Sequence, residues 1–211
     1  MPLDLGVLIS GSGTNLGAIL AAVADGRLDA RVRLVVSNRA DAGGLEKARA
    51  ANVPVRVISH RDYPSREAFD GAVVTALREA GVEWVVLAGF MRVVTPVLLG
   101  AFQDRVINIH PALLPAFPGV DAQAQAVEYG VRVSGCTVHF VDPGVDTGPI
   151  IAQSAVEVDP EDDRESLARR LLAKEHELLV RVLGWVAEGR VEIEPPREGA
   201  RRRVRVKRAP G

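Results

Sequence analysis

An asparagine and a histidine lie two residues apart within an apolar segment, residues 106–115. The first part of this segment is rich in β-branched residues, which favours a strand covered on both faces. The two-residue period of a strand places Asn108 and His110 on the same side. Pro111 ends the strand directly after the histidine, because proline has no N–H to donate to a sheet. An amide and an imidazole are therefore expected together where a strand leaves its sheet.

This pair of side chains has a chemical use. An amide can donate a hydrogen bond to an oxyanion that forms during a reaction, and an imidazole can transfer a proton. The segment alone is equally compatible with a structural interpretation, in which His110 is a core histidine and Asn108 a turn residue. Features elsewhere in the chain are needed to choose between the two interpretations.

The elements that must position the pair follow a regular alternation. Apolar segments predict strands, helical spacing predicts helices between them, and the long last helix should begin at Glu161 or Asp163 and end near Gly189. We expect an α/β fold: a Rossmann-like, doubly wound, mostly parallel sheet that continues into a mixed C-terminal sheet, with a long C-terminal helix. Ligands bind at the carboxyl ends of strands in such sheets. The predicted strands are 5–9, 32–37, 55–58, 83–89, 106–110, 134–141 and 150–158.

Capping residues predict where three helices begin. Asp41 is expected to cap a helix that runs to about Ala51, and Asp121 to cap a short helix that runs through Tyr129. Thr95 is followed by a proline, which suits the first position of a helix.

A glycine-rich loop, residues 11–15, follows the first predicted strand and leads into a helix. This arrangement presents backbone N–H groups and a positive helix end to an anion. The loop lacks the third glycine of a dinucleotide fingerprint and the Gly-Lys-Ser/Thr of a P-loop. Taken alone, it is at least as compatible with a tight strand-to-helix connection.

Two further loops carry side chains of interest. A hydrophobic loop, residues 90–94, follows the fourth strand and is expected to be either core or the wall of an apolar pocket. A turn-rich loop, residues 142–149, holds the carboxylates Asp142 and Asp146. The spacing around Arg66 favours a solvated charge in the first turn of a helix.

Composition bounds the protein class. The 211 residues are 47% hydrophobic and 4% aromatic, so the core should be aliphatic. No apolar segment approaches the ~18 residues of a membrane span, and no signal peptide is visible, so we expect a cytoplasmic protein. The single cysteine, Cys136, excludes an internal disulfide, and a mid-strand thiol is expected to be inert. No cluster has the spacing of metal ligands.

The charge is uneven along the chain. Seven basic residues and one acidic residue follow Pro196, which gives this segment a charge of +6 and leaves −7 for residues 1–196 of a chain whose net charge is −1. An acidic body does not favour general nucleic-acid binding. Residues 195–211 are interpreted as a flexible basic tail. Residues 1–194 are expected to form one domain with two halves, 1–103 and 104–194.

Five motifs together resemble the phosphoribosylglycinamide formyltransferases, the folate-dependent transformylases of purine synthesis. They fall in the family's order and cover about residues 5–190. The Asn-x-His-Pro-x-Leu-Leu-Pro motif and the later Asp-x-Gly-Pro are common to folate formyl-transferring and formyl-hydrolysing relatives, whereas the glycine-rich loop belongs more narrowly to the ribonucleotide enzyme. The motifs are residues 10–16, 87–92, 108–115, 136–141 and 146–150.

The resemblance implies an activity and a set of roles. The formyl group of 10-formyltetrahydrofolate would pass directly to the amine of glycinamide ribonucleotide, through a tetrahedral intermediate, in de novo purine biosynthesis. Asn108, His110 and Asp146 would be catalytic, with no metal. The ribonucleotide would contact Gly13, Thr14, Asn15 and Glu175. The folate would contact Arg66, Phe90, Met91, Arg92, Val93, Val94, Val141 and Asp142, the last two within a backbone segment that reads the pterin.

Some positions depart from the family or fit it in two ways. His139 is compatible with a role in the site and equally with a structural role in its strand. Relatives often carry histidines where this chain has Asp121 and Gln123, which leaves contacts from that loop to the substrate open.

Two rival functions remain beside the formyltransferase. One is a hydrolase that deformylates the folate with the same residues, and the other is a non-catalytic nucleotide-binding module. The presence of Asn108, His110 and Asp146 disfavours the module, and the glycine-rich loop, which a hydrolase would not require, disfavours the hydrolase. The expected partners are small-molecule substrates, without nucleic acid or membrane, for a monomer or weak homodimer.

Overall fold

The computed structural model describes residues 1–195 and 201–208. The chain divides into two units, Met1–Asn108 and Ile109–Gly211. The boundary between these units falls inside strand β5 (Val106–His110), whereas the two halves expected from sequence met before this strand, at residues 103 and 104.

The first unit is built on parallel strands. Their order is β3-β2-β1-β4, and the residues of β5 that belong to this unit pair in parallel with β4. The strand interiors are aliphatic and most are fully buried, as expected for a sheet covered on both faces. The strands are β1 (Leu3–Ile9), β2 (Ala30–Ser37), β3 (Val55–Val57), β4 (Trp84–Leu87) and β5.

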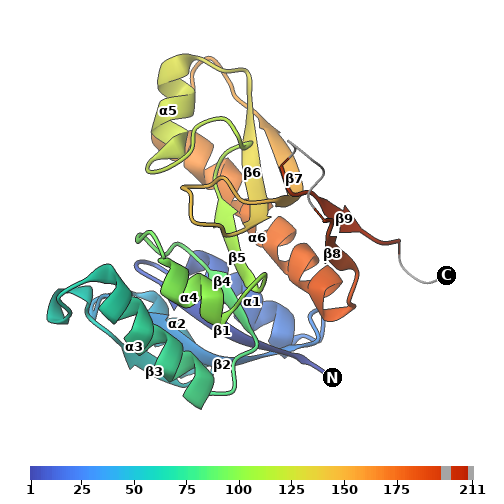
Figure 1. Cartoon of the computed structure of the whole chain (residues 1–211). Coiled ribbons are helices and arrows are strands. Elements are labelled where there is room, and N and C mark those ends of the chain that lie inside the picture. The colour runs from blue at the N-terminus through green and yellow to red at the C-terminus, as the bar shows by residue number, and fades with distance from the viewer. Residues whose placement is uncertain (196–200, 209–211) are drawn as a thin grey trace. The chain divides into compact units, whose positions relative to one another are not determined.

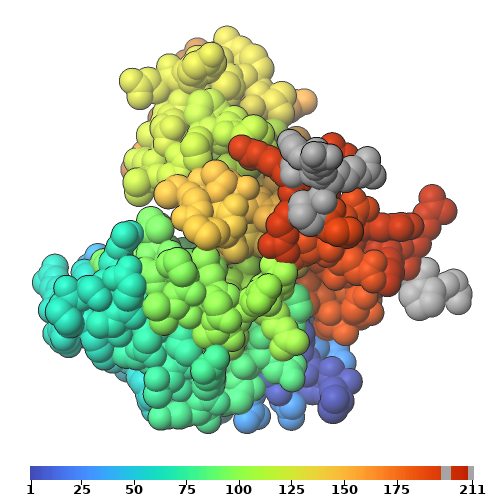
Figure 2. Space-filling view, viewed as in Figure 1, coloured from blue at the N-terminus to red at the C-terminus, as the bar shows by residue number. Residues whose placement is uncertain are grey.

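Helices cover both faces of this sheet, which is the doubly wound arrangement. Figure 1 shows α3 (Arg66–Glu79) and α4 (Pro96–Ala101) in front of the strands and α1 (Thr14–Ala24) and α2 (Gly44–Ala50) behind them. α3 packs against α4, and both reach the surface in Figure 2, where they are cyan to green. A 3₁₀ turn, η1 (His60–Asp62), precedes α3.

The start of α2 differs from the sequence prediction. The residue at its N-cap is Gly43, and the carboxylate of Asp41 instead binds the guanidinium of Arg39 at 2.7 Å. α4 begins as predicted, because the hydroxyl of Thr95 accepts from the N–H of Val97 and proline occupies the first turn.

The second unit joins an antiparallel strand pair to a long helix. β6 (Val133–Phe140) pairs with β7 (Ile150–Glu157), and α6 (Arg164–Ala187) packs against both strands (Figure 1). α5 (Ala122–Tyr129) packs against α6 through a cluster of apolar side chains. The buried members of this cluster are Ala126, Val158, Leu167 and Leu171.

The two predicted caps of this unit behave differently. Asp163 caps α6 through a capping box with Ser166, as one of the two expected starts required. Asp121 occupies the N-cap position of α5, but its φ is 56° and its side chain makes no cap hydrogen bond. The Asp121 carboxylate instead binds Arg164 at 2.7 Å, so this residue joins α5 to the start of α6.

Part of the basic tail is regular structure. β8 (Val191–Ile193) and β9 (Val204–Val206) form an antiparallel pair, which the interpretation of a flexible tail did not include. Lys207 donates its N–H to the carbonyl of Arg190 and forms an ion pair with Glu192. The remainder of the tail interpretation, at residues 196–200 and 209–211, lies outside the described residues.

None of the helices in the described ranges has the length and apolarity needed to cross a membrane.

Candidate active site

The glycine-rich loop connects β1 to α1 at the carboxyl edge of the first sheet. Gly13 occupies the N-cap position of α1 with a φ of 65°, which favours glycine, and Thr14 and Asn15 form the first turn. Gly13 also lies against Gly44 at the start of α2, where a Cβ on Gly13 would come within 2.5 Å of the Gly44 Cα. The loop can adopt this shape only because two glycines meet, and Gly44 was not singled out from sequence.

The hydrophobic loop follows β4 at the same edge of the sheet. Val94 is buried, whereas Met91 is 72% exposed and Val93 45% exposed. The ring of Phe90 stacks on Phe69 of α3, with ring centroids 6.5 Å apart. The loop therefore combines an anchored side with exposed apolar side chains, which supports the pocket-wall interpretation over a pure core role.

Arg92 in the hydrophobic loop and Thr95, which follows the loop, both contact side chains of α3. The guanidinium of Arg92 lies 5.5 Å above the ring of Phe69, a cation–π geometry. The buried carboxylate of Asp70 accepts from the N–H of Thr95 at 2.6 Å and from its hydroxyl at 2.8 Å. Burial raises the pKa of Asp70 above its ordinary 3.8, and these two hydrogen bonds only partly offset it.

Arg66 is exposed at the first position of α3. It forms no ion pair with any residue in the described part of the chain. Its position is compatible both with the solvated charge that the spacing favours and with the ligand contact that the resemblance implies.

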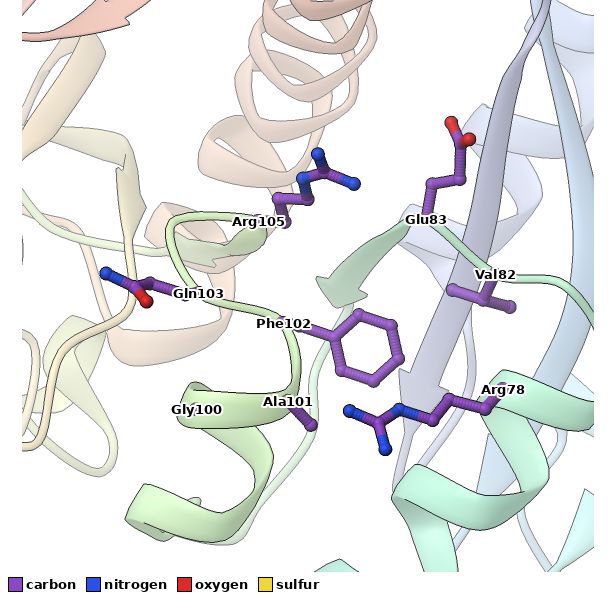
Figure 3. A pocket seen from close by; sticks show the side chains of 8 residues that line it. All are labelled: Arg78, Val82, Glu83, Gly100, Ala101, Phe102, Gln103 and Arg105. Atoms are coloured by element: carbon purple, nitrogen blue, oxygen red, sulfur yellow. The ribbon is translucent and has the colours of Figure 1, made fainter.

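A pocket of about 360 Å³ in the first unit does not involve any of these residues. Glu83 precedes β4 and Arg105 precedes β5, so the pocket lies at the amino ends of the strands, opposite to the edge that carries the two loops. Figure 3 shows the ring of Phe102 pointing toward Val82, with Arg78 below it. The lining is Arg78, Val82, Glu83, Gly100, Ala101, Phe102, Gln103 and Arg105.

β5 carries Asn108 and His110 as the sequence predicted. Asn108 is half-buried and His110 is 4% exposed. They are two residues apart in one strand, so their side chains leave it on the same side.

Both ring nitrogens of His110 face acceptors. Nε2 lies 2.8 Å from the carbonyl oxygen of Phe117, and Nδ1 lies 3.3 Å from Oδ2 of Asp146. A carbonyl and a carboxylate can only accept, so both contacts are satisfied together when each ring nitrogen carries a proton. The geometry therefore suits a positively charged imidazole beside a carboxylate.

Asp146 is the centre of the second unit's polar cluster. Its Oδ2 also accepts from the N–H of Gly119 at 2.8 Å, and its Oδ1 lies 3.6 Å from Nε2 of His139. Burial alone would raise the pKa of Asp146, but the contacts with His139, Gly119 and His110 outweigh it and hold the pKa below the ordinary 3.8. The carboxylate is thus ionised at neutral pH between two histidines.

His139 repeats the arrangement of His110. Its Nδ1 lies 2.8 Å from the carbonyl oxygen of Phe140, while its Nε2 faces Asp146. Of the two interpretations left open for His139, the contact with Asp146 favours a role in this cluster.

The loop that carries Asp146 is closed on itself. Oδ1 of Asp142 accepts from the hydroxyl of Thr147 at 2.6 Å and from the N–H of Gly144 at 3.1 Å. A Cβ on Gly148 would lie 1.8 Å from the carbonyl oxygen of Phe140, so only glycine fits there. Val141 and Asp142 are half-buried at the base of this loop, and the Asp142 carboxylate contributes to its shape.

The segment after His110 is fixed by β6 and β7. The hydroxyl of Thr137 donates to the carbonyl of Ala112 at 2.7 Å and accepts from the N–H of Leu114 at 3.1 Å. Gln153 donates to the carbonyl of Leu114 at 2.9 Å. These contacts hold the chain just beyond the catalytic histidine predicted from sequence.

Two further residues that the sequence analysis singled out are buried in the second unit. Glu175 is on α6 with 7% exposure, where it can present a carboxylate from a fixed helix. Cys136 is fully buried in β6, and burial raises the pKa of its thiol to about 12, in agreement with an unreactive cysteine.

Sequence reasoning missed several residues that complete the cluster. Phe117 and Gly119 contribute backbone groups, which no side-chain pattern could reveal. No group of three or more His, Cys, Asp or Glu residues that could hold a metal ion is found within residues 1–195 and 201–208.

Comparison with known proteins is consistent with this geometry. The formyl transferase family model matches residues 4–183. The crystal structure of glycinamide ribonucleotide transformylase 1 from Symbiobacterium toebii is 53% identical, with a TM-score of 0.92 over 97% of this chain and 94% of that one. This likeness confirms the predicted fold class.

Curated proteins give the same result. The phosphoribosylglycinamide formyltransferase of Escherichia coli (strain K12) is 39% identical over 90% of both chains. The trifunctional purine biosynthetic protein adenosine-3 of Drosophila pseudoobscura pseudoobscura is 49% identical over 87% of this chain, which spans only 14% of that much longer relative. The chain belongs to the formyl transferase family and, within it, to the phosphoribosylglycinamide formyltransferases.

Proposed function

We propose that this protein transfers the formyl group of 10-formyltetrahydrofolate directly to the amine of glycinamide ribonucleotide, in de novo purine biosynthesis. The products are formylglycinamide ribonucleotide and tetrahydrofolate. The observation that carries the proposal is the ionised Asp146 beside His110 on the strand of Asn108, in a chain whose relatives are formyltransferases.

The reaction begins when the amine nitrogen attacks the formyl carbon. A C–N bond forms, and the carbonyl oxygen becomes an oxyanion. The amide of Asn108 donates to this oxygen, a contact whose removal typically costs about 10²–10³ in rate. The imidazole of His110 hydrogen-bonds the same oxygen.

Collapse of the intermediate breaks the bond between the formyl carbon and N10 of the folate. N10 gains a proton, and the attacking nitrogen loses one, so no net proton is consumed. His110 supplies or receives this proton, and Asp146 keeps the imidazole oriented and favours its positive charge. For the Nε2 of His110 to act on substrate, the carbonyl of Phe117 must give up its hydrogen bond.

The substrate contacts are proposed from the family resemblance. The glycine-rich loop supplies backbone donors for the ribonucleotide phosphate through Gly13, Thr14 and Asn15, and Glu175 contacts the ribose. The hydrophobic loop, with Arg66, Val141 and Asp142, receives the folate. Phosphate binding remote from the reacting amine would make transfer faster than hydrolysis.

The experiment is a comparison of acceptors. Purified protein is mixed with 10-formyltetrahydrofolate, with and without glycinamide ribonucleotide, while folate absorbance and the mass of the ribonucleotide are followed. We expect loss of the formyl group only when the ribonucleotide is present, together with a gain of one formyl group on it. Equal deformylation without ribonucleotide would support the hydrolase instead.

A further inference from the structure

Residues beyond the carboxyl ends of four neighbouring strands of the first unit form one hydrogen-bonded chain. The strand order is β3-β2-β1-β4. His60 starts the 3₁₀ turn after β3, Asn38 and Ser10 directly follow β2 and β1, and Met91 lies in the hydrophobic loop after β4. The chain therefore crosses the carboxyl edge of the sheet in the order of the strands. It joins the residue before the glycine-rich loop to the hydrophobic loop.

The donors and acceptors are well matched along this chain. The N–H of Met91 donates to Oγ of Ser10 at 2.9 Å, and the Ser10 hydroxyl donates to Oδ1 of Asn38 at 2.7 Å. Nδ2 of Asn38 lies 3.3 Å from Nδ1 of His60, so the amide can donate to the ring. The N–H of Ser10 also donates to the carbonyl of Gly89 at 3.1 Å. Ser10 therefore bonds to the backbone on both sides of Phe90, where the chain turns into the hydrophobic loop.

The far end of the chain returns to the same loop through aromatic contacts. The ring of His60 meets Phe69 edge-on, with centroids 6.4 Å apart and an interplanar angle of 89°. Phe69 in turn stacks on Phe90 and lies under Arg92. The hydrophobic loop is thus held at its backbone by Ser10 and at its side chains by Phe69.

We propose that Ser10 is a positioning residue, which sets the hydrophobic loop relative to the glycine-rich loop through this hydrogen-bond chain. The inference rests on the proposed function, in which these loops bind the folate and the ribonucleotide. Ser10 touches no substrate in this proposal and acts through the N–H of Met91.

The burial of these hydrogen-bonded side chains makes the hydroxyl of Ser10 hard to replace. Ser10 is 5% exposed and Asn38 is 6% exposed, so water cannot readily substitute for a lost partner. Ser10→Ala leaves the Met91 N–H and Oδ1 of Asn38 without the contacts described. The hydrophobic loop then samples other positions, whereas Asn108, His110 and Asp146 stay unchanged.

The chain offers a matched control on the adjacent strand. Ser37 is fully buried at the end of β2, and its hydroxyl donates to the carbonyl of Arg39 at 2.8 Å and accepts from the Arg39 N–H. Ser37→Ala therefore also deletes a buried, doubly bonded hydroxyl, but one that does not reach the hydrophobic loop.

Steady-state kinetics separate positioning from general destabilisation. With Ser10→Ala we expect the KM for 10-formyltetrahydrofolate to rise about tenfold, while kcat at saturating substrates changes less than about threefold. With Ser37→Ala both should stay near wild type. Equal effects of the two substitutions, or an unchanged KM in Ser10→Ala, would overturn the proposal.

A ligand-free measurement keeps the proposal distinguishable from the proposed function. Amide hydrogen exchange at Met91, followed by NMR, should be slow in the wild type and in Ser37→Ala and at least tenfold faster in Ser10→Ala. This result supports the positioning role even if the wild type fails to formylate the ribonucleotide. Unchanged exchange at Met91 contradicts it, whatever the activity.

A second substitution covers the case in which Ser10→Ala does not fold. His60→Phe keeps an aromatic edge against Phe69 and removes the ring nitrogen that faces Asn38. We expect a smaller, two- to fourfold rise in the folate KM and faster exchange at Met91. No change in either quantity would show that the hydrogen bonds beyond Ser10 do not contribute.

Discussion

Gly13 and Gly44 meet so closely that neither can carry a side chain without movement of the other. A Cβ on Gly13 would lie 2.5 Å from the Cα of Gly44, and a Cβ on Gly44 would lie 2.6 Å from Cδ1 of Ile9. The contact joins the start of α1 to the start of α2 beneath the glycine-rich loop, so the shape of that loop depends on both.

Gly13→Ala tests this contact. The new Cβ meets backbone, and a φ of 65° is unfavourable for alanine, so we expect a loss of about 1–2 kcal/mol of stability. Ribonucleotide affinity should fall at least tenfold, measured by calorimetry, with folate affinity changed much less.

Gly17→Ala is the control for that substitution. Gly17 lies in α1, the same helix that Gly13 caps, and its Cβ would lie 3.6 Å from the flexible Cδ of Lys47 in α2, an ordinary van der Waals contact. Gly17→Ala should bind the ribonucleotide normally. Unchanged ribonucleotide affinity in Gly13→Ala would remove the loop from the binding site.

Asp146→Asn tests the catalytic role proposed for the cluster of Asp146, His110 and His139. The amide keeps the size of the carboxylate but loses its negative charge beside His110 and His139, so turnover should fall by about 10²–10⁴ with the fold retained. Steady-state kinetics at saturating substrates measure the effect. Near-normal turnover would refute the role given to Asp146.

The same variant makes a prediction about pH and stability. The pKa of Asp146 is lowered in the native state, so its stabilising contribution is complete above the unfolded value near 3.8 and is lost as pH falls through the native pKa. The difference in unfolding free energy between wild type and Asp146→Asn should therefore shrink as pH falls below 3.8. Urea titrations across this interval measure it.

Asp70 should behave in the opposite way. Burial raises its native pKa, so the native state binds the proton more tightly than the unfolded state does. Its contribution is greatest below 3.8 and declines as pH rises through the native value. The stability of the wild type relative to Asp70→Asn should fall over that interval. A relative stability that rises with pH there would contradict the assigned environment.

The strand that carries Asn108 and His110 could be predicted from sequence because its information is local. Alternation within one strand is enough to place Asn108 and His110 on one side, and proline marks where the strand ends. The partners of His110 could not be predicted in this way. The Phe117 carbonyl reaches Nε2 from a residue with a φ of 52°, and such backbone geometry leaves no side-chain pattern.

The side-chain caps expected from Asp41 and Asp121 are absent for the same physical reason. Asp41 and Asp121 are good N-cap residues, but each lies near an arginine that binds its carboxylate. For Asp121 that arginine is 43 positions away in sequence, so the competition appears only once the chain has folded. Gly44 was missed for a similar reason, because its importance comes from its contact with Gly13 rather than from its own neighbours.

Two buried hydroxyls on β6 give a stability prediction. Ser134 is 3% exposed, and its hydroxyl has no hydrogen-bond partner among the described residues, whereas Thr137 bonds to Ala112, Leu114 and Gln153. Ser134→Ala should leave the free energy of unfolding unchanged or raise it by up to ~1 kcal/mol.

Thr137→Val is the counterpart of Ser134→Ala. It leaves the carbonyl of Ala112 and the N–H of Leu114 without their partner, and should cost about 1–3 kcal/mol. Thermal unfolding of both variants measures the contrast. Equal destabilisation by the two substitutions would contradict the described hydrogen bonds.

Because β9 pairs with β8, truncation of the C-terminal segment should reduce the stability of the protein. Deleting residues 199–211 removes β9 and its bonds to Arg190 and Glu194. We expect the melting temperature to fall, by about 2–4 °C for each kcal/mol lost. Deleting only residues 209–211 leaves β9 intact and should have little effect. An unchanged melting temperature after the longer deletion would show that β9 adds no stability.

The carbonyl of Phe117 can report spectroscopically on the hydrogen bonding of His110. Because this group accepts from Nε2 of His110, its stretching frequency depends on that hydrogen bond. A ¹³C=¹⁸O label at this single peptide group would separate its infrared band from the rest of the backbone. Ligands that draw Nε2 away should shift the band to higher frequency, so each substrate's effect on the imidazole could be recorded without turnover.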